Sequence, residues 1–253
     1  MKFTQTYLLT LLVGLALTFA VEKTNAQAYE WVELPGSTTQ ENIEDIRTDD
    51  TGNSYVTGKF NNTLILGTDT LVSYGSADCF TAKYDPSGNV IWAVSEGGIY
   101  EDVGVEIDFD AAGNCYVGGR FIDTVNIGDT FYVSEGNVDI FVVKYDPSGN
   151  VVYVNTLGGN REDRCRGLKV DDAGYCYVSG RYRILGLFDT IFLPVVGIED
   201  VFVAKLDLDG SVLWAKSYGG PKLDFGEAIT LDKDDNIIIT GSFFKNMTLG
   251  DTT

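Results

Sequence analysis

Three arginines lie close together in an otherwise strongly acidic chain, and their side chains are suited to binding an anion. Arg161, Arg164 and Arg166 fall within the stretch 160–166. A guanidinium group can donate two parallel hydrogen bonds to a planar oxyanion, so this spacing predicts a site for a carboxylate or an acidic sugar. The alternative is that these arginines form ordinary surface ion pairs with neighbouring carboxylates.

Two acidic clusters offer oxygen ligands of the kind that calcium prefers. The first contains Asp207 and Asp209, and the second contains Asp232 and Asp234. Neither has the full calcium-binding loop that ends in a glutamate. Both fall where a hairpin turn is expected, and aspartate is also a turn-forming residue. Calcium is therefore the one cofactor that the sequence suggests, with a purely structural turn as the alternative.

Catalytic chemistry has fewer candidates, because the chain contains no histidine. A Ser-His-Asp triad, a histidine base and a histidine metal site are excluded in this segment. A carboxylate pair for glycoside cleavage remains open. Asp102, Asp163 and Asp224 recur at one spacing and are interpreted as loop caps, because a catalytic group is normally needed once. Tyr100 and Lys222 join the candidate ligand-binding residues but form no catalytic constellation, so no catalytic residue is assigned.

A repeat of 61 residues must position these side chains. The heptapeptide YDPSGNV occurs at 84–90 and again at 145–151. Tryptophan or tyrosine, glycine, aspartate and lysine keep the same step along the chain: Trp31, Trp92, Tyr153, Trp214; Gly36, Gly97, Gly158, Gly219; Asp49, Asp110, Asp171, Asp232; Lys83, Lys144, Lys205. A fixed period of this kind indicates a repeat architecture, with repeats that start near 31, 92, 153 and 214.

Each repeat divides into four short strands, here named a to d, separated by turn-forming residues. In the second copy they are expected at 103–110, 115–121, 139–145 and 151–156, with a weaker hairpin around Gly128 between strands b and c. The Asp-Pro-Ser-Gly-Asn motif connects strands c and d, since proline presets the turn and glycine accepts a positive φ. No stretch after the N-terminal segment has helical apolar spacing, so the fold class is predicted to be all-β.

Strand c shows how the repeats should pack. Residues 140–143 and 201–204 are apolar at consecutive positions, which is typical of a strand covered on both faces. Four-stranded antiparallel sheets, each lying between its neighbours, predict a β-propeller built of 61-residue blades. Recurrent glycines in strand b suggest close backbone approach between sheets: Gly58, Gly119, Gly180, Gly241. The a–b and c–d turns should lie at one end of each sheet, with the variable d–a and b–c connections at the other.

The repeat resembles the seven-bladed beta-propeller (SBBP) repeat of secreted bacterial proteins over residues 31–253. The resemblance is carried by these residues: Asp110, Gly113, Asn114, Tyr116, Val117, Gly119, Phe121, 139–142, Lys144, Tyr145, Gly158, Gly159. It implies a propeller fold and an exported bacterial protein.

The N-terminal segment predicts export. Lys2 precedes an apolar run at 8–20, and a small-residue cleavage site follows at 26–28, so residues 1–28 are interpreted as a signal peptide. The apolar run is too short to span a bilayer, which argues against an integral membrane protein. Residues 29–253 then hold about three and a half blades. This is an incomplete, open propeller, and the sequence is expected to be a fragment of a longer protein.

Charge and cysteine content narrow the class of protein further. The chain has 18 Lys and Arg against 37 Asp and Glu, a net charge of -19, so nucleic acid is an improbable partner. The four cysteines do not have the spacing of a dense disulfide framework and are interpreted mainly as small buried apolar residues.

The favoured function is a secreted or surface-exposed scaffold that binds a protein or glycan through its variable loops. Two alternatives stay open: an enzyme acting on polysaccharide through paired carboxylates, and a structural spacer in a larger adhesin. Ligand identity, the blade number of the full protein, oligomeric state and disulfide state do not follow from the sequence.

Overall fold

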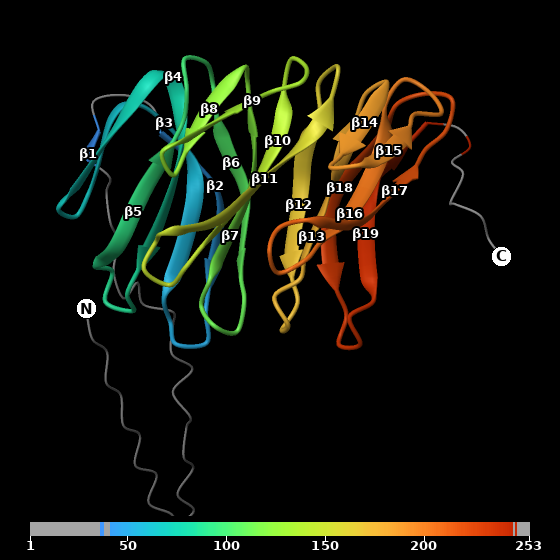
Figure 1. Ribbon diagram of the computed structural model, residues 1–253. Coiled ribbons are helices and arrows are strands. Elements are labelled where there is room, and N and C mark those ends of the chain that lie inside the picture. Colours follow the sequence, from blue (N-terminus) through green and yellow to red (C-terminus); the bar gives the residue numbers. More distant parts are fainter. Residues whose placement is uncertain (1–35, 38–40, 245, 247–253) are drawn as a thin grey trace, which may run out of the picture. The chain divides into compact units, whose positions relative to one another are not determined.

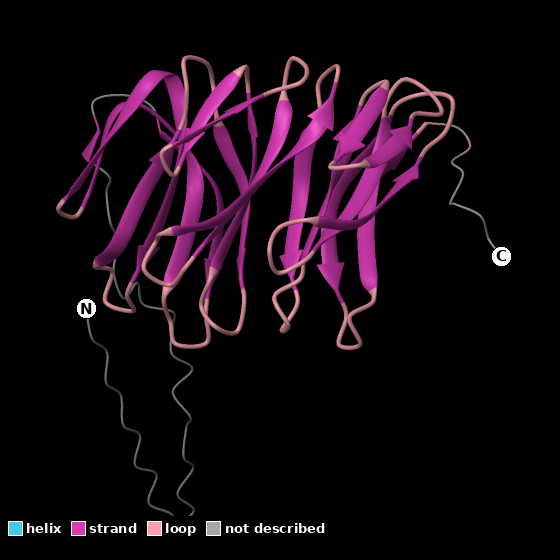
Figure 2. Ribbon diagram, viewed as in Figure 1, coloured by secondary structure: helices cyan, strands magenta, loops and turns pink. Residues whose placement is uncertain are grey.

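The computed structural model describes residues 36–37, 41–244 and 246, and all regular structure in these ranges is β-strand (Figure 2). The described residues belong to one compact unit, Glu33–Thr253. The predicted signal peptide, residues 1–28, lies outside the described residues. The boundary between it and the repeats therefore stays a prediction, whereas the predicted all-β class is confirmed.

The strands form successive antiparallel sheets in chain order (Figure 1). The first sheet has the order β2–β3–β4–β5, the second β6–β7–β10–β11, the third β12–β13–β16–β17, and β18 pairs with β19. Their bounds are β2 Glu41–Thr48, β3 Ser54–Leu66, β4 Asp69–Tyr84, β5 Val90–Glu96, β6 Val103–Phe109, β7 Cys115–Phe121, β10 Asp139–Tyr145, β11 Val151–Gly159, β12 Arg164–Val170, β13 Cys176–Tyr182, β16 Asp200–Leu206, β17 Val212–Tyr218, β18 Asp224–Leu231 and β19 Ile237–Phe243. The strands predicted for the second copy agree closely with β6, β7, β10 and β11.

A β-hairpin connects strands b and c and ties neighbouring sheets together. In the second and third sheets it consists of β8 (Thr124–Ile127) with β9 (Thr130–Val133), and β14 (Leu185–Phe188) with β15 (Ile191–Pro194). The end of the preceding strand d pairs with this hairpin, as Gly97 does with Asn126 and as Gly158 does with Leu187. Likewise β1 (Gly36–Ser37) pairs with the extended part of β3. Each sheet is thus hydrogen-bonded to the next.

Packing between sheets supplies the core. Strand a of each sheet lies on the preceding sheet, as β6 does on β2–β4 and as β12 does on β6 and β7. All seven residues of β10 are buried, which confirms that strand c is covered on both faces. Together these sheets make an open β-propeller-like fold, as the repeat predicted.

The turns explain why the same short motif recurs. Asp146 Oδ1 accepts hydrogen bonds from the backbone N–H groups of Ser148 (2.8 Å) and Asn150 (2.9 Å), and Gly149 adopts a φ of 86°. The third copy lacks the proline, yet Asp207 makes the same two bonds to residues 209 and 211. The aspartate and the glycine therefore define this turn.

The glycines of strand b allow a close approach, but not the one predicted. A Cβ on Gly119 would lie 2.4 Å from the carbonyl oxygen of Val103 and 2.1 Å from the ring of Phe141. Val103 and Phe141 lie on the strands flanking Gly119 in its own sheet, where strands a and b pair through a register shift. The prediction that these glycines serve contacts between sheets was wrong. They accommodate the bulge within each sheet.

The four cysteines are buried and free, which confirms their interpretation as small apolar residues. Cys79 and Cys115 belong to the core between the first and second sheets, and Cys165 and Cys176 to the core between the second and third.

Candidate functional site

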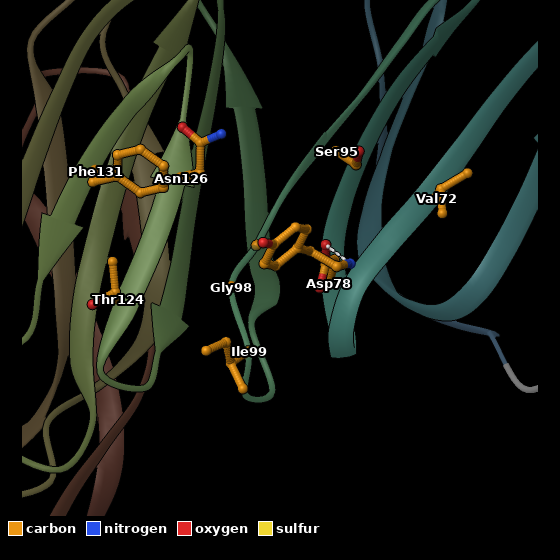
Figure 3. Close-up of a pocket in the computed structure, with 10 residues that line it drawn as sticks. Val72, Asp78, Ser95, Gly98, Ile99, Thr124, Asn126 and Phe131 are labelled. Carbon is orange, nitrogen blue, oxygen red and sulfur yellow. Dashed lines mark hydrogen bonds between the residues drawn. The ribbon is translucent and has the colours of Figure 1, made fainter.

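The d–a loops lie at one end of the sheets, opposite the a–b and c–d turns (Figure 1). The b–c hairpins begin at the same end, but their tips reach back to the start of strand d, as Gly128 does beside Val151. Connections vary more freely than the strands that they join, so a binding site is expected there. At this end a pocket of about 520 Å³ opens between the b–c hairpins of the first and second sheets. It is named the hairpin groove here, and its lining is Val72, Tyr74, Asp78, Ser95, Gly97, Gly98, Ile99, Thr124, Asn126 and Phe131 (Figure 3).

Large apolar side chains around the hairpin groove are exposed. Tyr74 is 81% exposed, Phe131 72%, Ile99 68% and Val72 64%. These residues come from three connections, since Val72 and Tyr74 lie on β4, Ile99 follows β5, and Phe131 lies on β9. Exposed apolar residues that converge on one hollow indicate a binding surface rather than scattered surface side chains.

A buried carboxyl group lies at the groove between these apolar side chains. Asp78 Oδ2 accepts a hydrogen bond from the backbone N–H of Tyr74 at 2.9 Å, which holds the chain around Tyr74 in place. Burial raises the pKa of Asp78 to about 6. Gly97 makes room for this carboxyl group, because a Cβ there would lie 2.1 Å from Asp78 Cγ.

The same carboxyl group recurs in the other sheets, which assigns it a structural role. Asp139 accepts from the N–H of Glu135 at 2.8 Å, and Asp200 accepts from the N–H of Val196 at 2.7 Å. What distinguishes the hairpin groove is therefore the aromatic side chain on its rim, since position 74 is tyrosine there but Glu135 and Val196 in the next two copies.

A second set of recurrent carboxylates caps the d–a loops, as predicted. Asp102 accepts from the N–H of Gly98 at 2.7 Å and from that of Ile122 at 3.3 Å. Asp163 and Asp224 make the equivalent pairs of bonds, to Gly159 and Arg183 and to Gly220 and Phe244. All three are fully buried, and burial raises the pKa of Asp102 and of Asp163 to about 7.

The predicted ligand-binding residues fall into two groups. Tyr100, Arg161 and Lys222 occupy one position in three successive d–a loops, and all three are exposed. Within the described ranges, no hydrogen bond or ion pair joins Tyr100, Arg161 and Lys222 to one another. Arg164 and Arg166 lie on β12, where Arg164 pairs with Glu162 in the loop before it. The ion pairing foreseen as the alternative thus holds for Arg164.

Pairing of strands a and b brings further arginines to Arg164. Arg181 on β13 is its direct partner in the sheet, and the guanidinium of Arg181 lies 4.7 Å from the ring centre of Phe225. Glu199, which is 2% exposed at its side chain, bridges Arg181 (3.1 Å) and Arg183 (3.4 Å). Sequence reasoning missed Arg181, Arg183 and Glu199. Regular a–b pairing would place Arg181 opposite Cys165, and the register shift between Cys165 and Gly167 brings it opposite Arg164 instead.

The acidic clusters are engaged in turns. Asp207 and Asp232 each accept backbone N–H bonds two and four residues ahead, and Asp234 pairs with Lys233. Asp209 donates its backbone N–H to Asp207. In the part of the chain that the structure describes, no group of three or more histidine, cysteine or acidic side chains is placed to hold a metal ion. Over the same residues there is no helix with the length and apolar character needed to cross a membrane.

Comparisons with known proteins bear on the fold. No protein-family model matches the chain. It is 25% identical over 207 residues to an uncharacterized WD repeat-containing protein of Acanthamoeba polyphaga mimivirus, covering 71% of this chain and 15% of that protein. It is 26% identical over 175 residues to the regulatory protein FlaEY of Caulobacter vibrioides, covering 66% of this chain and 18% of that protein. The chain thus spans less than a fifth of either curated relative, and the first similarity supports a β-propeller-like repeat fold.

Proposed function

We propose that this chain is an exported interaction scaffold of the SBBP repeat type, which holds a protein partner in the hairpin groove. The observation that carries this proposal is the convergence of Val72, Tyr74, Ile99 and Phe131, all exposed, on one hollow between two sheets. The similarity to a WD repeat-containing protein supports a scaffold role. Rigid sheets on either side would let the groove bind with little loss of conformational entropy.

The chemistry of the groove and of the whole chain points to a basic, partly apolar peptide segment as the bound element. Aromatic and aliphatic side chains supply the binding energy in typical protein interfaces. The net charge of -19 attracts a cationic partner from a distance. Tyr74 and Phe131 can also contact a lysine or arginine side chain through their ring faces.

Selection from a displayed library of random peptides tests this proposal. Enriched peptides should contain lysine or arginine next to apolar residues, and binding should weaken at least tenfold in Tyr74→Ala and in Phe131→Ala. Phe192→Ala is the matched control, since Phe192 occupies the position of Phe131 in the next hairpin, is 62% exposed and does not line the groove. Peptides that bind all four proteins equally would contradict the groove as the site.

Two further experiments distinguish a peptide-binding groove from a carbohydrate-binding site and from an enzyme. Binding on a glycan array, without peptide binding, would assign the groove to a carbohydrate. Release of reducing sugar that is lost on substitution of a single carboxylate would favour the enzyme instead. Export is tested separately. If the signal peptide is cleaved after Ala28, the secreted chain begins at Tyr29.

A further inference from the structure

Four arginines lie together at the d–a end of the third sheet, in a chain with a net charge of -19. They come from β12, from β13 and from the residues just after β13, and they are named the arginine cluster here: Arg164, Arg166, Arg181, Arg183. Two carboxylates neutralise part of this charge, because Glu162 pairs with Arg164 and Glu199 lies between Arg181 and Arg183. Four positive charges against two negative ones leave an excess of two.

The second sheet shows that this excess is not part of the common repeat. Three positions of the arginine cluster are apolar there: Val103, Val105, Ile122. Only the position of Arg181 is cationic, and Arg120 at that position pairs with Glu101 at 2.8 Å. The third sheet therefore has three additional arginines but one additional carboxylate, since Val138 stands where the third sheet has Glu199. The fold forms without these charges, so a role in binding is the better explanation for them.

Pairing of β12 with β13 places two like charges next to each other. Arg164 and Arg181 are direct partners in the sheet. Like charges directly opposite each other destabilise a pair of strands. Burial lowers the pKa of Arg181, and the charges of Arg164 and Arg166 lower it further, although Glu199 raises it. An anion between the guanidinium groups would offset this repulsion.

Two donors of the arginine cluster have no acceptor. The Nε atoms of Arg181 and Arg183 are buried, and neither donates a hydrogen bond to any residue that the structure describes. Glu199 Oε1 lies 3.1 Å from Arg181 Nε without accepting a hydrogen bond from it. Buried N–H groups normally have a partner. The side chains of Arg164 and Arg183 are 29% and 42% exposed, so a small solute can reach the cluster.

We propose that the arginine cluster binds a small molecule through one oxyanion group, of which the carboxylate of an acidic sugar is the first candidate. Guanidinium groups bind carboxylates, sulfates and phosphates through paired, charge-assisted hydrogen bonds. The net charge of -19 repels an extended polyanion from a distance, so a short ligand suits this site better than a nucleic acid. The site shares no residue with the lining of the hairpin groove, and neither proposal depends on the other.

Isothermal titration calorimetry of the full chain with galacturonate, inorganic phosphate and inorganic sulfate, at one ionic strength, tests the proposal. At least one of these probes should bind saturably with one site per chain. Tighter binding of galacturonate would assign the natural ligand to acidic sugars, and tighter binding of phosphate or sulfate would assign it to compounds that carry those groups. The absence of saturable binding by all three probes would overturn the proposal.

Substitutions in the cluster locate the site. Arg181→Gln and Arg183→Gln should each weaken binding about tenfold or more, because each removes charge-assisted hydrogen bonds to the oxyanion. Arg181→Lys should also weaken it, since an ammonium group lacks the planar fork. Lys59→Gln is the matched control and should leave the affinity unchanged, because Lys59 occupies the position of Arg181 in the first sheet.

Removal of a competing carboxylate has the opposite expected sign. Glu162→Gln removes the charge that engages Arg164, so the affinity for the oxyanion should rise roughly threefold or more. Glu101→Gln is the control, since Glu101 is the equivalent residue before the second sheet. A structural role for the arginines alone predicts that Glu162→Gln changes stability without changing binding.

Circular dichroism checks that each variant folds. Arg183→Gln keeps the test valid if Arg181→Gln does not fold, because the side chain of Arg183 is the more exposed of the two. Equal binding by wild type, Arg183→Gln and Lys59→Gln would mean that the anion binds elsewhere. An unchanged affinity in Glu162→Gln would likewise contradict the arginine cluster as the site.

Discussion

The hydroxyl of Tyr145, on the second sheet, donates a hydrogen bond to the buried carboxyl group of Glu96 at the end of the first. Burial raises the pKa of Glu96 to about 7 although this hydrogen bond opposes the shift. Burial likewise raises the pKa of Asp78 and of Asp139 to about 6. The carboxyl group of Glu96 therefore loses its proton near neutral pH, and those of Asp78 and Asp139 lose theirs near pH 6.

Stability is expected to fall as pH rises from about 5 to 8. These groups bind protons more tightly in the folded chain than in the unfolded one, so their contribution is complete below the unfolded pKa and lost as pH rises through about 6 to 7. Urea unfolding at both pH values measures the change. Glu96→Gln should reduce the pH dependence and gain roughly 1–3 kcal/mol at pH 8 relative to wild type. The exposed Glu227→Gln is the control, and an equal effect there would rule out Glu96 as the source.

Loss of a loop cap should destabilise the chain more than loss of a surface aspartate. Asp163→Ala leaves the buried N–H group of Gly159 and the partly buried N–H group of Arg183 without their acceptor, which costs about 2–4 kcal/mol in the free energy of unfolding. Asp172→Ala, at an exposed turn position, should change it by less than about 0.5 kcal/mol. If both variants melt together with wild type, the capping role is wrong.

Gly119→Ala should be severely destabilising, because its methyl group would overlap Val103 and Phe141. A cost of about 3 kcal/mol or more is expected for this overpacking. Gly113→Ala gives the comparison, since its Cβ meets nothing closer than Pro147 at 3.9 Å and only its φ of 81° causes strain, roughly 1 kcal/mol. In thermal unfolding, the melting temperature of Gly119→Ala should be clearly lower than that of Gly113→Ala.

The four thiols should be unreactive in the folded chain. Burial raises the pKa of Cys79, Cys115, Cys165 and Cys176, so little thiolate is available. Titration with a thiol reagent should label none of them under native conditions and all four in denaturant. Fewer than four in denaturant would reveal a disulfide bond.

Much of the fold could be predicted because turn chemistry and burial act locally. Asp146 and Gly149 determine their turn by bonds within five residues, and β10 shows in its own sequence that it is covered on both faces. The role of Asp102 followed from its recurrence alone. Gly119 was placed correctly but explained wrongly, because a bulge between strands leaves no mark on the residue types.

The groove could not be predicted in the same way. Tyr74 and Phe131 lie on different hairpins, and they line one hollow only because strand d of one sheet pairs with the hairpin of the next. The candidate arginines were found by composition, whereas the pairing of Glu199 with Arg181 and Arg183 depends on where neighbouring strands place these residues. Such relationships between distant segments require the assembled sheets.

Gly97 pairs with Asn126, and Gly158 pairs with Leu187, so the end of each strand d is hydrogen-bonded to the hairpin of the next repeat. The segments that unfold together should therefore not coincide with the 61-residue repeats. A sheet cannot separate from its follower without releasing part of that follower's hairpin. Native-state hydrogen exchange should therefore show that each hairpin opens together with the sheet before it. An added repeat would therefore need to keep the pairing between the end of strand d of one sheet and the b–c hairpin of the next.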